Sequence, residues 1–209
     1  MTKKKKQHLI TFGIIFGVLL VDQIIKILVK TNMHLHESIE ITDWFYIAFT
    51  ENNGMAFGME FIGKLFLTLF RLVAIGAIGY FVSKCIESKA KTGFIVCMAM
   101  IIAGAAGNII DCLFYGCIFS ESTHQAIATF VPFGEGYQTL LHGKVVDMFY
   151  FPLFEFDWPM WLPMVGGDHF IFFSPIFNFA DASISLGVVG LIAFYRHSLN
   201  RHFDAIFGR

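Results

Sequence analysis

Charged residues are scarce in this chain of 209 residues: Asp, Glu, Lys and Arg together make up 15 %, against about 25 % in a typical soluble domain. Hydrophobic residues make up 56 %, and Phe alone occurs 26 times. This composition excludes an ordinary soluble domain and indicates several membrane-spanning segments. The few basic residues lie beside hydrophobic runs and form no nucleic-acid-binding motif, so nucleic acid is not expected as a partner.

Cysteine is also rare, and the four residues are Cys85, Cys97, Cys112 and Cys117. They form no CxxC pair and have no metal-ligand spacing with histidine. His34 and His36 alternate on an expected strand, but two histidines without a third ligand are weak evidence for a metal. We therefore expect neither a metal centre nor a cofactor. A disulfide between Cys112 and Cys117 is compatible with their spacing but is not expected.

Four apolar runs approach or reach the roughly 20 residues that cross a bilayer, at about residues 10–29, 65–82, 94–114 and 174–195. Lys and Arg gather at both ends of the chain and between the second and third runs, whereas residues 31–64 and 115–173 are acidic in balance. The positive-inside rule then places both termini in the cytoplasm and these two segments outside. The sequence predicts one multi-pass membrane domain, 1–209, with four transmembrane helices.

The two external segments differ in what they predict. Residues 39–50 (IEITDWFYIAFT) are rich in β-branched and aromatic residues, which indicates short strands, and Asn53-Gly54 is a turn signal. Residues 115–173 are too long for a plain connection. This second segment is predicted to hold a hairpin or a small interfacial structure, because Trp158 and Trp161 suit the headgroup level of a membrane.

Polar side chains recur inside the apolar runs, where they are costly and normally face the bundle interior or a wet cavity. They are Asp22 and Lys26 in the first run, Arg71 in the second, Asn108 and Asp111 in the third, and Asn178 and Asp181 in the fourth. The runs alternate in direction, so these carboxylates and amides are predicted to lie at similar depth near the external face. Small residues in both the second run (Gly76, Gly79) and the third (Gly104, Gly107) permit close helix contact.

Asp147 adds another carboxylate, among apolar neighbours in the second external segment. Two carboxylates that lie close together cannot both ionise cheaply, so they share a proton. One can then activate water as a base, while the other polarises a carbonyl and later protonates a leaving amine. If Asp147 and Asp181 meet, the residues provide for peptide hydrolysis without a metal or a covalent nucleophile. The sequence alone does not show that they meet.

Three other functions fit the same polar residues. A proton-coupled transporter would use Asp22, Asp111 and Asp181 as a relay, but it predicts carboxylates spread across the bilayer and commonly an inverted repeat. An assembly factor would use the amides and carboxylates only as hydrogen bonds between helices. A peptidase with Lys26 as base and Ser183 or Ser185 as nucleophile is possible in principle. None of these explains the motifs described next.

Five motifs resemble those of lipoprotein signal peptidase, the bacterial type II signal peptidase. They are Asp22-Gln23 with Lys26, Asn52-Asn53-Gly54-Met55-Ala56-Phe57, Gly107-Asn108-Ile109-Ile110-Asp111, Val145-Val146-Asp147-Met148-Phe149 and Phe177-Asn178-Phe179-Ala180-Asp181. They occur in the family's order and lie in the first, third and fourth apolar runs and in both external segments. The resemblance implies a membrane α-helical fold with four transmembrane helices, a small extracytoplasmic β-rich cradle formed by residues 31–64, and an inserted external segment.

The resemblance also implies an activity and a site. Such enzymes are aspartic endopeptidases of the bacterial cytoplasmic (inner) membrane, and they cut a prolipoprotein signal peptide before a diacylglyceryl-modified cysteine. It assigns catalysis to Asp147 and Asp181. It assigns substrate binding to Asn52, Gly54, Asn108, Asp111 and Asn178, with Asp22 and Lys26 as structural support. Membrane lipids and prolipoproteins are the partners it implies for a protein expected to be a monomer.

Two departures from the family pattern stand out. Cys112 occupies the place after Asp111 where the family usually has Arg, and Arg71 is a hypothetical substitute for that cation. The region around Asp147 is also longer than usual, with insertions at residues 118–142 and 151–173 whose role the sequence does not assign.

Overall fold

The structure is a computed structural model that describes residues 2–52 and 64–208. In this part of the chain, four long apolar helices are able to cross a membrane by length and composition. They are α1 (Lys3–Asn32); α2 (Lys64–Glu87); α3 (Thr92–Ile110), continued by the π-helical turn η2 (Asp111–Tyr115) and α4 (Gly116–Ile118); and α5 (Phe179–Gly190), continued by the π-helical turn η3 (Leu191–Tyr195) and α6 (Arg196–Phe207). The predicted four-helix membrane fold is confirmed.

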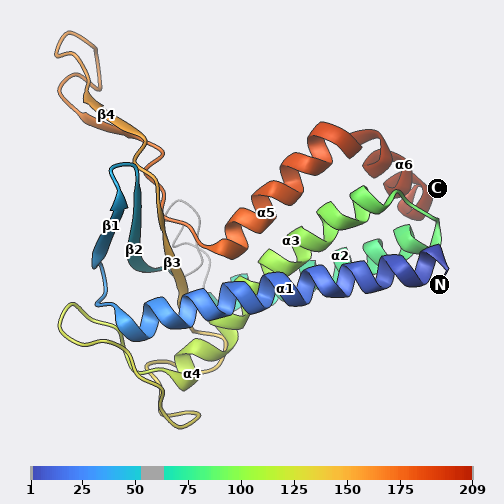
Figure 1. Cartoon of the computed structure of the whole chain (residues 1–209), viewed down its shortest axis with the longest axis horizontal. Coiled ribbons are helices and arrows are strands. Elements are labelled where there is room, and N and C mark those ends of the chain that lie inside the picture. The colour runs from blue at the N-terminus through green and yellow to red at the C-terminus, as the bar shows by residue number, and fades with distance from the viewer. Residues whose placement is uncertain (1, 53–63, 209) are drawn as a thin grey trace.

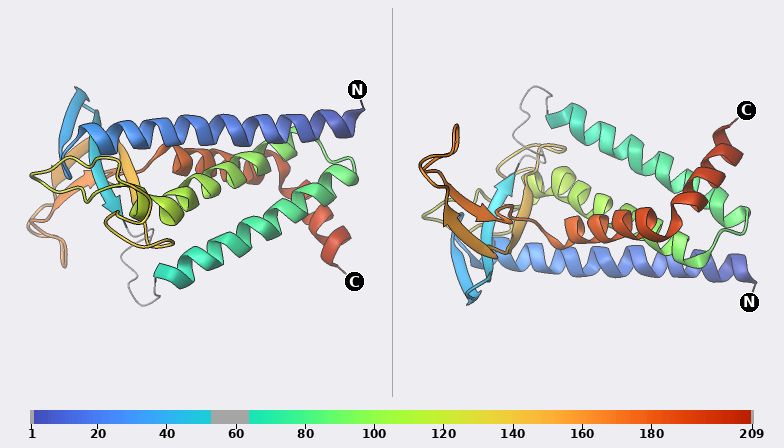
Figure 2. Two further views of the ribbon diagram at one scale, coloured as in Figure 1. Left: turned by 90° about the horizontal axis from the view of Figure 1, so that it is seen from below. Right: turned by 90° about the horizontal axis from the view of Figure 1, so that it is seen from above.

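Helix α3 lies at the centre of the bundle, as the two views in Figure 2 show. In the most apolar stretch of this span half of the residues are buried, against 17–22 % in the corresponding stretches of the other spans. Gly104 permits this packing, because a Cβ there would lie 2.2 Å from the carbonyl oxygen of Ala180 on α5. The expectation for Gly76 and Gly79 was wrong: beyond the backbone of α2 and the adjacent residues, no atom in the described part of the chain lies within 4 Å of a Cβ built at either position.

A small antiparallel sheet lies at the end of the bundle opposite to both chain termini (Figure 1). Its strand order is β1 (Ser38–Thr42), β2 (Phe45–Asn52) and β3 (Val145–Tyr150). This confirms the strands expected in residues 39–50, whereas the expected Asn53-Gly54 turn lies outside the described residues. His34 and His36 lie in the turn before β1 and not on a strand, since α1 continues to Asn32.

The fourth span begins later than its apolar run suggests. Residues 174–177 are not helical, and Phe177 instead pairs with Phe149 in an antiparallel bridge. Asn178 is the N-cap of α5: its side chain accepts a hydrogen bond from the Asp181 backbone N–H (2.9 Å), and the Asp181 carboxylate accepts one from the Asn178 N–H (3.2 Å). This reciprocal capping box fixes where the helix starts.

The second external segment divides into two parts. Residues 119–144 fold against the sheet end of α1, where Phe119 joins Val29, Phe49 and Val146 in a compact apolar cluster. Residues 151–173 project from the sheet as a hairpin made of β4 (Phe154–Asp157) and β5 (His169–Phe172) (Figure 1). All four cysteines are free thiols, so Cys112 and Cys117 do not form a disulfide.

Candidate active site

Asp147 and Asn178 are brought together by the bridge between β3 and the segment before α5. Because Phe149 pairs with Phe177, the side chain of Asp147 lies beside the N-terminus of the helix. The Asn178 amide donates to Asp147 Oδ1 at 2.6 Å, and it lies 3.3 Å from the carbonyl oxygen of Val146. Asn178 is fully buried and Asp147 is 3 % exposed, so this hydrogen bond is shielded from water.

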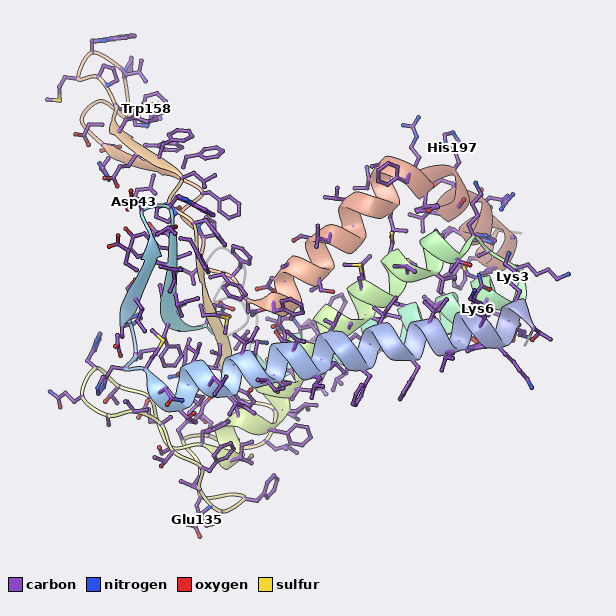
Figure 3. All side chains as sticks on the ribbon, in the orientation of Figure 1. Lys3, Lys6, Asp43, Glu135, Trp158 and His197 are labelled. Atoms are coloured by element: carbon purple, nitrogen blue, oxygen red, sulfur yellow. The ribbon has the colours of Figure 1, made fainter. Side chains whose placement is uncertain are left out.

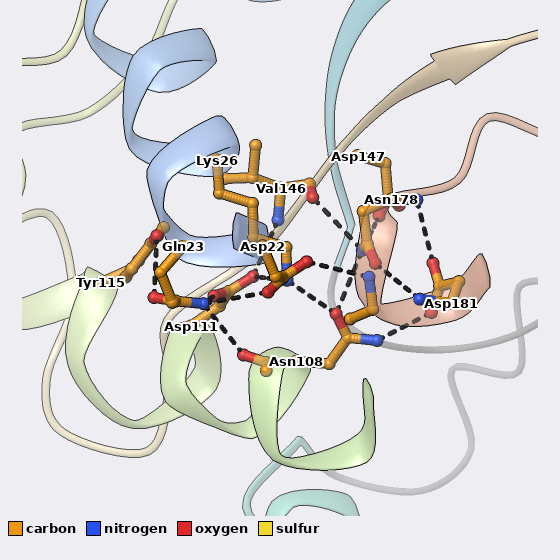
Figure 4. A network of polar contacts seen from close by, with 12 residues as sticks. Asp22, Gln23, Lys26, Asn108, Asp111, Tyr115, Val146, Asp147, Asn178 and Asp181 are labelled. Atoms are coloured by element: carbon orange, nitrogen blue, oxygen red, sulfur yellow. Dashed lines mark hydrogen bonds and ion pairs between the residues drawn. The ribbon is translucent and has the colours of Figure 1, made fainter. Parts of the chain in front are cut away.

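Asn108 joins this pair to Asp181. Its amide nitrogen donates to Asp181 Oδ1 at 2.7 Å, and its amide oxygen accepts from the Asn178 amide at 3.0 Å (Figure 4). A chain of hydrogen bonds therefore runs from Asp147 through Asn178 and Asn108 to Asp181. The prediction that these side chains lie at similar depth is confirmed, because their atoms make direct contact.

Lys26 sets the orientation of the Asn108 amide. Its ammonium lies 2.8 Å from Asn108 Oδ1, 3.0 Å from Asp22 Oδ2 and 2.7 Å from Asp111 Oδ2. An ammonium only donates, so it holds the amide oxygen of Asn108 and leaves the NH₂ group directed at Asp181. Lys26, Asp22 and Asp111 are completely buried. The Lys26 ammonium is therefore enclosed by protein and does not extend to a membrane interface, as it could if Lys26 and Asp22 formed a surface ion pair.

The two carboxylates beside Lys26 also hold backbone groups in place. Asp22 Oδ1 accepts from the N–H of Ala180 in the first turn of α5 (2.9 Å), and Asp111 Oδ2 accepts from the N–H of Val146 on β3 (3.3 Å). Lys26 is a cation that contacts Asp111. That Arg71 stands in for the arginine of the family pattern remains a prediction. Asp111 begins the π-helical turn η2, and such turns are frequent at functional sites.

The electrostatic surroundings of Asp147 favour its protonated form. Burial and then the charge of Asp181 raise the pKa of Asp147 to about 7, and these effects outweigh the hydrogen bond from Asn178, the charge of Lys26 and the hydrogen bond from Asn52. The Asn52 amide, at the end of β2, donates to Asp147 Oδ2. A carboxyl with this pKa can change its protonation state near neutral pH, as an acid–base group requires.

Sequence reasoning assigned no role to residues on two sides of this network. Gln23 donates to Asp111 (2.9 Å) and accepts from the hydroxyl of Tyr115 (3.2 Å). Beyond it, buried Lys30 pairs with Glu51 and donates to Ser122 (2.9 Å). The available signal was the i, i+4, i+8 spacing of Asp22, Lys26 and Lys30 on one face of α1. Gly54, a predicted site residue, lies outside the described residues.

In residues 2–52 and 64–208, no group of three or more His, Cys, Asp or Glu side chains is arranged to hold a metal ion. The carboxylates of the network are instead matched to nitrogen donors: Lys26, the amides of Asn52, Asn108 and Asn178, and backbone N–H groups. The arrangement is suited to holding the carboxyl groups of Asp147 and Asp181 in fixed positions while the two groups share few protons.

Comparison with known proteins places this chain in a family. The model of the family described as signal peptidase (SPase) II matches residues 14–196. A lipoprotein signal peptidase of Porphyromonas gingivalis is 50 % identical over 199 residues, which cover 95 % of this chain and 88 % of the relative. One of Amoebophilus asiaticus is 32 % identical over 208 residues, covering 96 % and 82 %.

Solved structures agree with this fold. Two that are described as bacterial membrane enzymes, determined by the in meso method at 1.9 and 2.3 Å resolution, superpose with TM-scores of 0.57 and 0.58 at 24 % and 25 % identity. The alignments cover 88 % and 91 % of this chain and 90 % of each solved chain. From the extent of the family match and the identity to its relatives, the chain belongs to the signal peptidase II family.

Proposed function

We propose that the protein is an aspartic endopeptidase that removes the signal peptide from diacylglyceryl-modified prolipoproteins, cutting before the lipidated cysteine. Family membership and the lipoprotein signal peptidases that it resembles support a peptidase acting on prolipoproteins. The observation that carries the aspartic mechanism is the hydrogen-bonded chain between Asp147 and Asp181, together with the pKa of about 7 for Asp147.

In the proposed reaction, the pair holds one proton. The ionised carboxylate takes a proton from water, and the water oxygen attacks the carbonyl carbon of the scissile peptide bond. The protonated carboxyl donates a hydrogen bond to the carbonyl oxygen, which stabilises the charge that develops there. The C–N bond then breaks, and a proton passes from the pair to the leaving amine. Because the groups are coupled, the proton belongs to the pair and not to one named residue.

The amides have distinct proposed roles. Asn52 and Asn178 each donate to Asp147, and Asn108 donates to Asp181, so they fix the distance and orientation of the catalytic pair. Asn52, Gly54 and Asn108 are also proposed to bind backbone groups of the substrate. Asn178 was expected to do so as well, but its complete burial and its contacts with Asn108, Asp147 and Asp181 favour a supporting role. Asp111 was expected to bind substrate, but its complete burial and its contacts with Lys26, Gln23 and Val146 favour a supporting role.

The membrane orientation is proposed from charge and position together. Lys3 and Lys6 lie at the end of the bundle that holds both termini (Figure 3), and the sheet and the candidate site lie toward the other end. Positive-inside bias favours a cytoplasmic position for the terminal end. The active site would then open near the extracytoplasmic face of the bacterial inner membrane, where a monomer would meet lipid-modified substrates and surrounding lipids.

The test is cleavage of a synthetic prolipoprotein peptide by the protein in lipid nanodiscs, with a chelator present. Two peptides of one sequence are compared, with and without diacylglycerol on the cysteine, and products are identified by mass spectrometry. The proposal predicts a single cut before the cysteine in the lipidated peptide and little cleavage of the other. Cleavage at another bond, equal cleavage of both peptides, or no cleavage of several lipidated peptides would contradict it.

A further inference from the structure

The β4–β5 hairpin has two chemically different faces. Opposed residues of an antiparallel pair point to the same face, and the register pairs Phe154 with Phe172 and Phe156 with Phe170. The alternate pairs are Glu155 with Ile171 and Asp157 with His169. One face is therefore entirely aromatic, whereas three of the four side chains on the other face can carry charge.

The aromatic face is a continuous ladder of rings. The ring centroids of Phe154 and Phe172 lie 4.6 Å apart, those of Phe156 and Phe170 lie 5.2 Å apart, and Trp158 lies 4.9 Å from Phe156. These rings contact one another, yet Phe154 is 53 % exposed and Phe172 is 43 % exposed. At the hairpin tip, Trp161 is 77 % and Met164 fully exposed, which extends the apolar surface.

The opposite face is suited to water. The His169 side chain forms ion pairs with Asp157 (2.7 Å) and Glu155 (3.4 Å), and all three side chains are at least half exposed. Residues 151–173 contain no Lys or Arg, so the hairpin carries only acidic fixed charge. Attraction to an anionic surface is therefore excluded as the force that would hold it in place.

The hairpin is held across the sheet end of the helix bundle. Its base is fixed by stacked rings, with Phe151 4.7 Å from Phe45 and 5.7 Å from Phe177. From this base the hairpin runs roughly across the direction of α1 (Figure 1). Aromatic rings project from it toward the side on which the helices lie, and carboxylate oxygens project away (Figure 3). This is the orientation of a structure lying flat on the bilayer that surrounds the helices.

An isolated two-stranded hairpin is at best marginally stable in water, so an exposed aromatic face of this kind needs an apolar partner. The partner that already meets the exposed apolar sides of the helices on this side of the molecule is lipid. Trp is favoured at the headgroup level, where its apolar ring is buried and its N–H stays wet, and Phe rings on the apolar face of an interfacial structure are buried at the boundary with the acyl chains. A lipid surface accounts for both faces of the hairpin at once.

We propose that the β4–β5 hairpin lies on the outer surface of the membrane, with the Phe154, Phe156, Phe170 and Phe172 rings at the boundary between headgroups and acyl chains of electrically neutral lipids. This assigns the insertion at residues 151–173 to membrane contact beside the active site. The proposal rests on the membrane orientation given above and not on the identity of the catalytic residues, so it can fail while the peptidase assignment stands.

The test places a single tryptophan on each face of the hairpin. In a background of Trp44→Phe, Trp158→Phe and Trp161→Phe, Phe154→Trp reports on the aromatic face and the neighbouring Glu155→Trp on the charged face. Phe172→Trp and Ile171→Trp form a second matched pair on β5, which covers failure of one variant to fold. Each protein is reconstituted in nanodiscs of phosphatidylcholine, and its fluorescence is measured with brominated lipid and, separately, with aqueous iodide.

The proposal predicts that brominated lipid quenches the indoles introduced at Phe154 and Phe172 several-fold more than those introduced at Glu155 and Ile171, and that iodide shows the reverse order. Equal quenching of both faces by iodide, without lipid quenching, would overturn it and indicate a hairpin in water. Protection of the aromatic face from both quenchers would also overturn it and indicate a protein cover such as a second copy. Nanodiscs of phosphatidylglycerol test the lipid class: markedly stronger lipid quenching there would overturn the preference for neutral headgroups.

Discussion

Replacing Lys26 by Met removes the charge at the centre of the buried network while nearly keeping the length of the side chain. In the native protein the ammonium lies 2.7 Å from Asp111 and 3.0 Å from Asp22, and all three side chains are fully buried. Lys26→Met leaves two buried carboxylates without their cation. Removing one partner of a buried ion pair costs about 3–5 kcal/mol, and we expect at least this loss here because two carboxylates share the ammonium.

For a chain of this size, 1 kcal/mol corresponds to about 2–4 °C in Tm, so Lys26→Met is expected to lower Tm by about 6–20 °C. Thermal unfolding in nanodiscs measures this. The matched control is Lys84→Met, because Lys84 pairs with Glu87 at 3.0 Å on the surface, where an ion pair contributes about 0–1 kcal/mol. Adding Asp111→Asn to Lys26→Met is expected to restore part of the loss, since one uncompensated carboxylate is removed.

Lys26→Met also perturbs the candidate site. The charge of Lys26 holds the pKa of Asp147 down, and its ammonium holds the amide oxygen of Asn108, so the variant is expected to raise the pKa of Asp147 and lose most peptidase activity. A Tm no lower than that of Lys84→Met, or no gain from adding Asp111→Asn, would refute the account of a buried cation that organises the site.

Three further predictions concern other parts of the molecule. Because the pKa of Asp147 rises from 3.8 to about 7 on folding, the unfolded chain releases this proton first as pH rises. Wild-type stability therefore falls between about pH 4 and 7, and the free energy of unfolding of Asp147→Asn should gain up to about 4 kcal/mol on wild type across that window. A difference between their pH–stability curves that does not change with pH would contradict this. Glu51→Gln removes the carboxylate beside buried Lys30 and is expected to cost about 3–5 kcal/mol. Glu87→Gln breaks the surface ion pair with Lys84 and should cost about 0–1 kcal/mol. Equal shifts in Tm would show that the Lys30 cluster does not support the fold. Gly104→Ala forces a Cβ against the Ala180 carbonyl and should destabilise the protein by about 1–3 kcal/mol. Gly76→Ala meets open space and should stabilise α2 by about 0.5–1 kcal/mol. Similar Tm values for the two variants would exclude close α3–α5 packing as the reason for glycine at position 104.

Features set by local composition could be predicted from the sequence. Long apolar runs identify the helices. Inside lipid, all backbone N–H and C=O groups must form hydrogen bonds within the protein, and a segment that is not part of a closed barrel achieves this only as a helix. The similar depth of Asn108 and Asp181, which form a hydrogen bond, followed from the opposite directions of the two spans that carry them. The start of α5 was misplaced because apolar character alone extends to residue 174, although Asn178 followed by Asp181 three positions later carried a capping signal.

Contacts between distant segments could not be predicted in the same way. The pairing of Lys30 with Glu51 and Ser122 joins α1, β2 and an insertion, and no local spacing relates these three positions. The choice of Lys26 as the cation beside Asp111 depends on how α1 is rotated against α3, which sequence periodicity sets only approximately. The two faces of the β4–β5 hairpin depend on strand register, because a shift of one residue would place the Phe residues of β4 opposite the other face of β5 and mix the two faces.

The central claim is that Asp147 and Asp181 act together on the substrate. The most direct measurement is the single-turnover rate of cleavage of a diacylglyceryl prolipoprotein peptide by Asp147→Asn, Asp181→Asn and the control Asp43→Asn, which alters an exposed carboxylate in the turn between β1 and β2. Unchanged helical circular dichroism and a cooperative thermal transition would show that each variant is folded. The account predicts that both site variants lose cleavage while the control keeps the wild-type rate. Cleavage at the wild-type rate by a folded Asp147→Asn or Asp181→Asn protein would contradict the two-carboxylate mechanism.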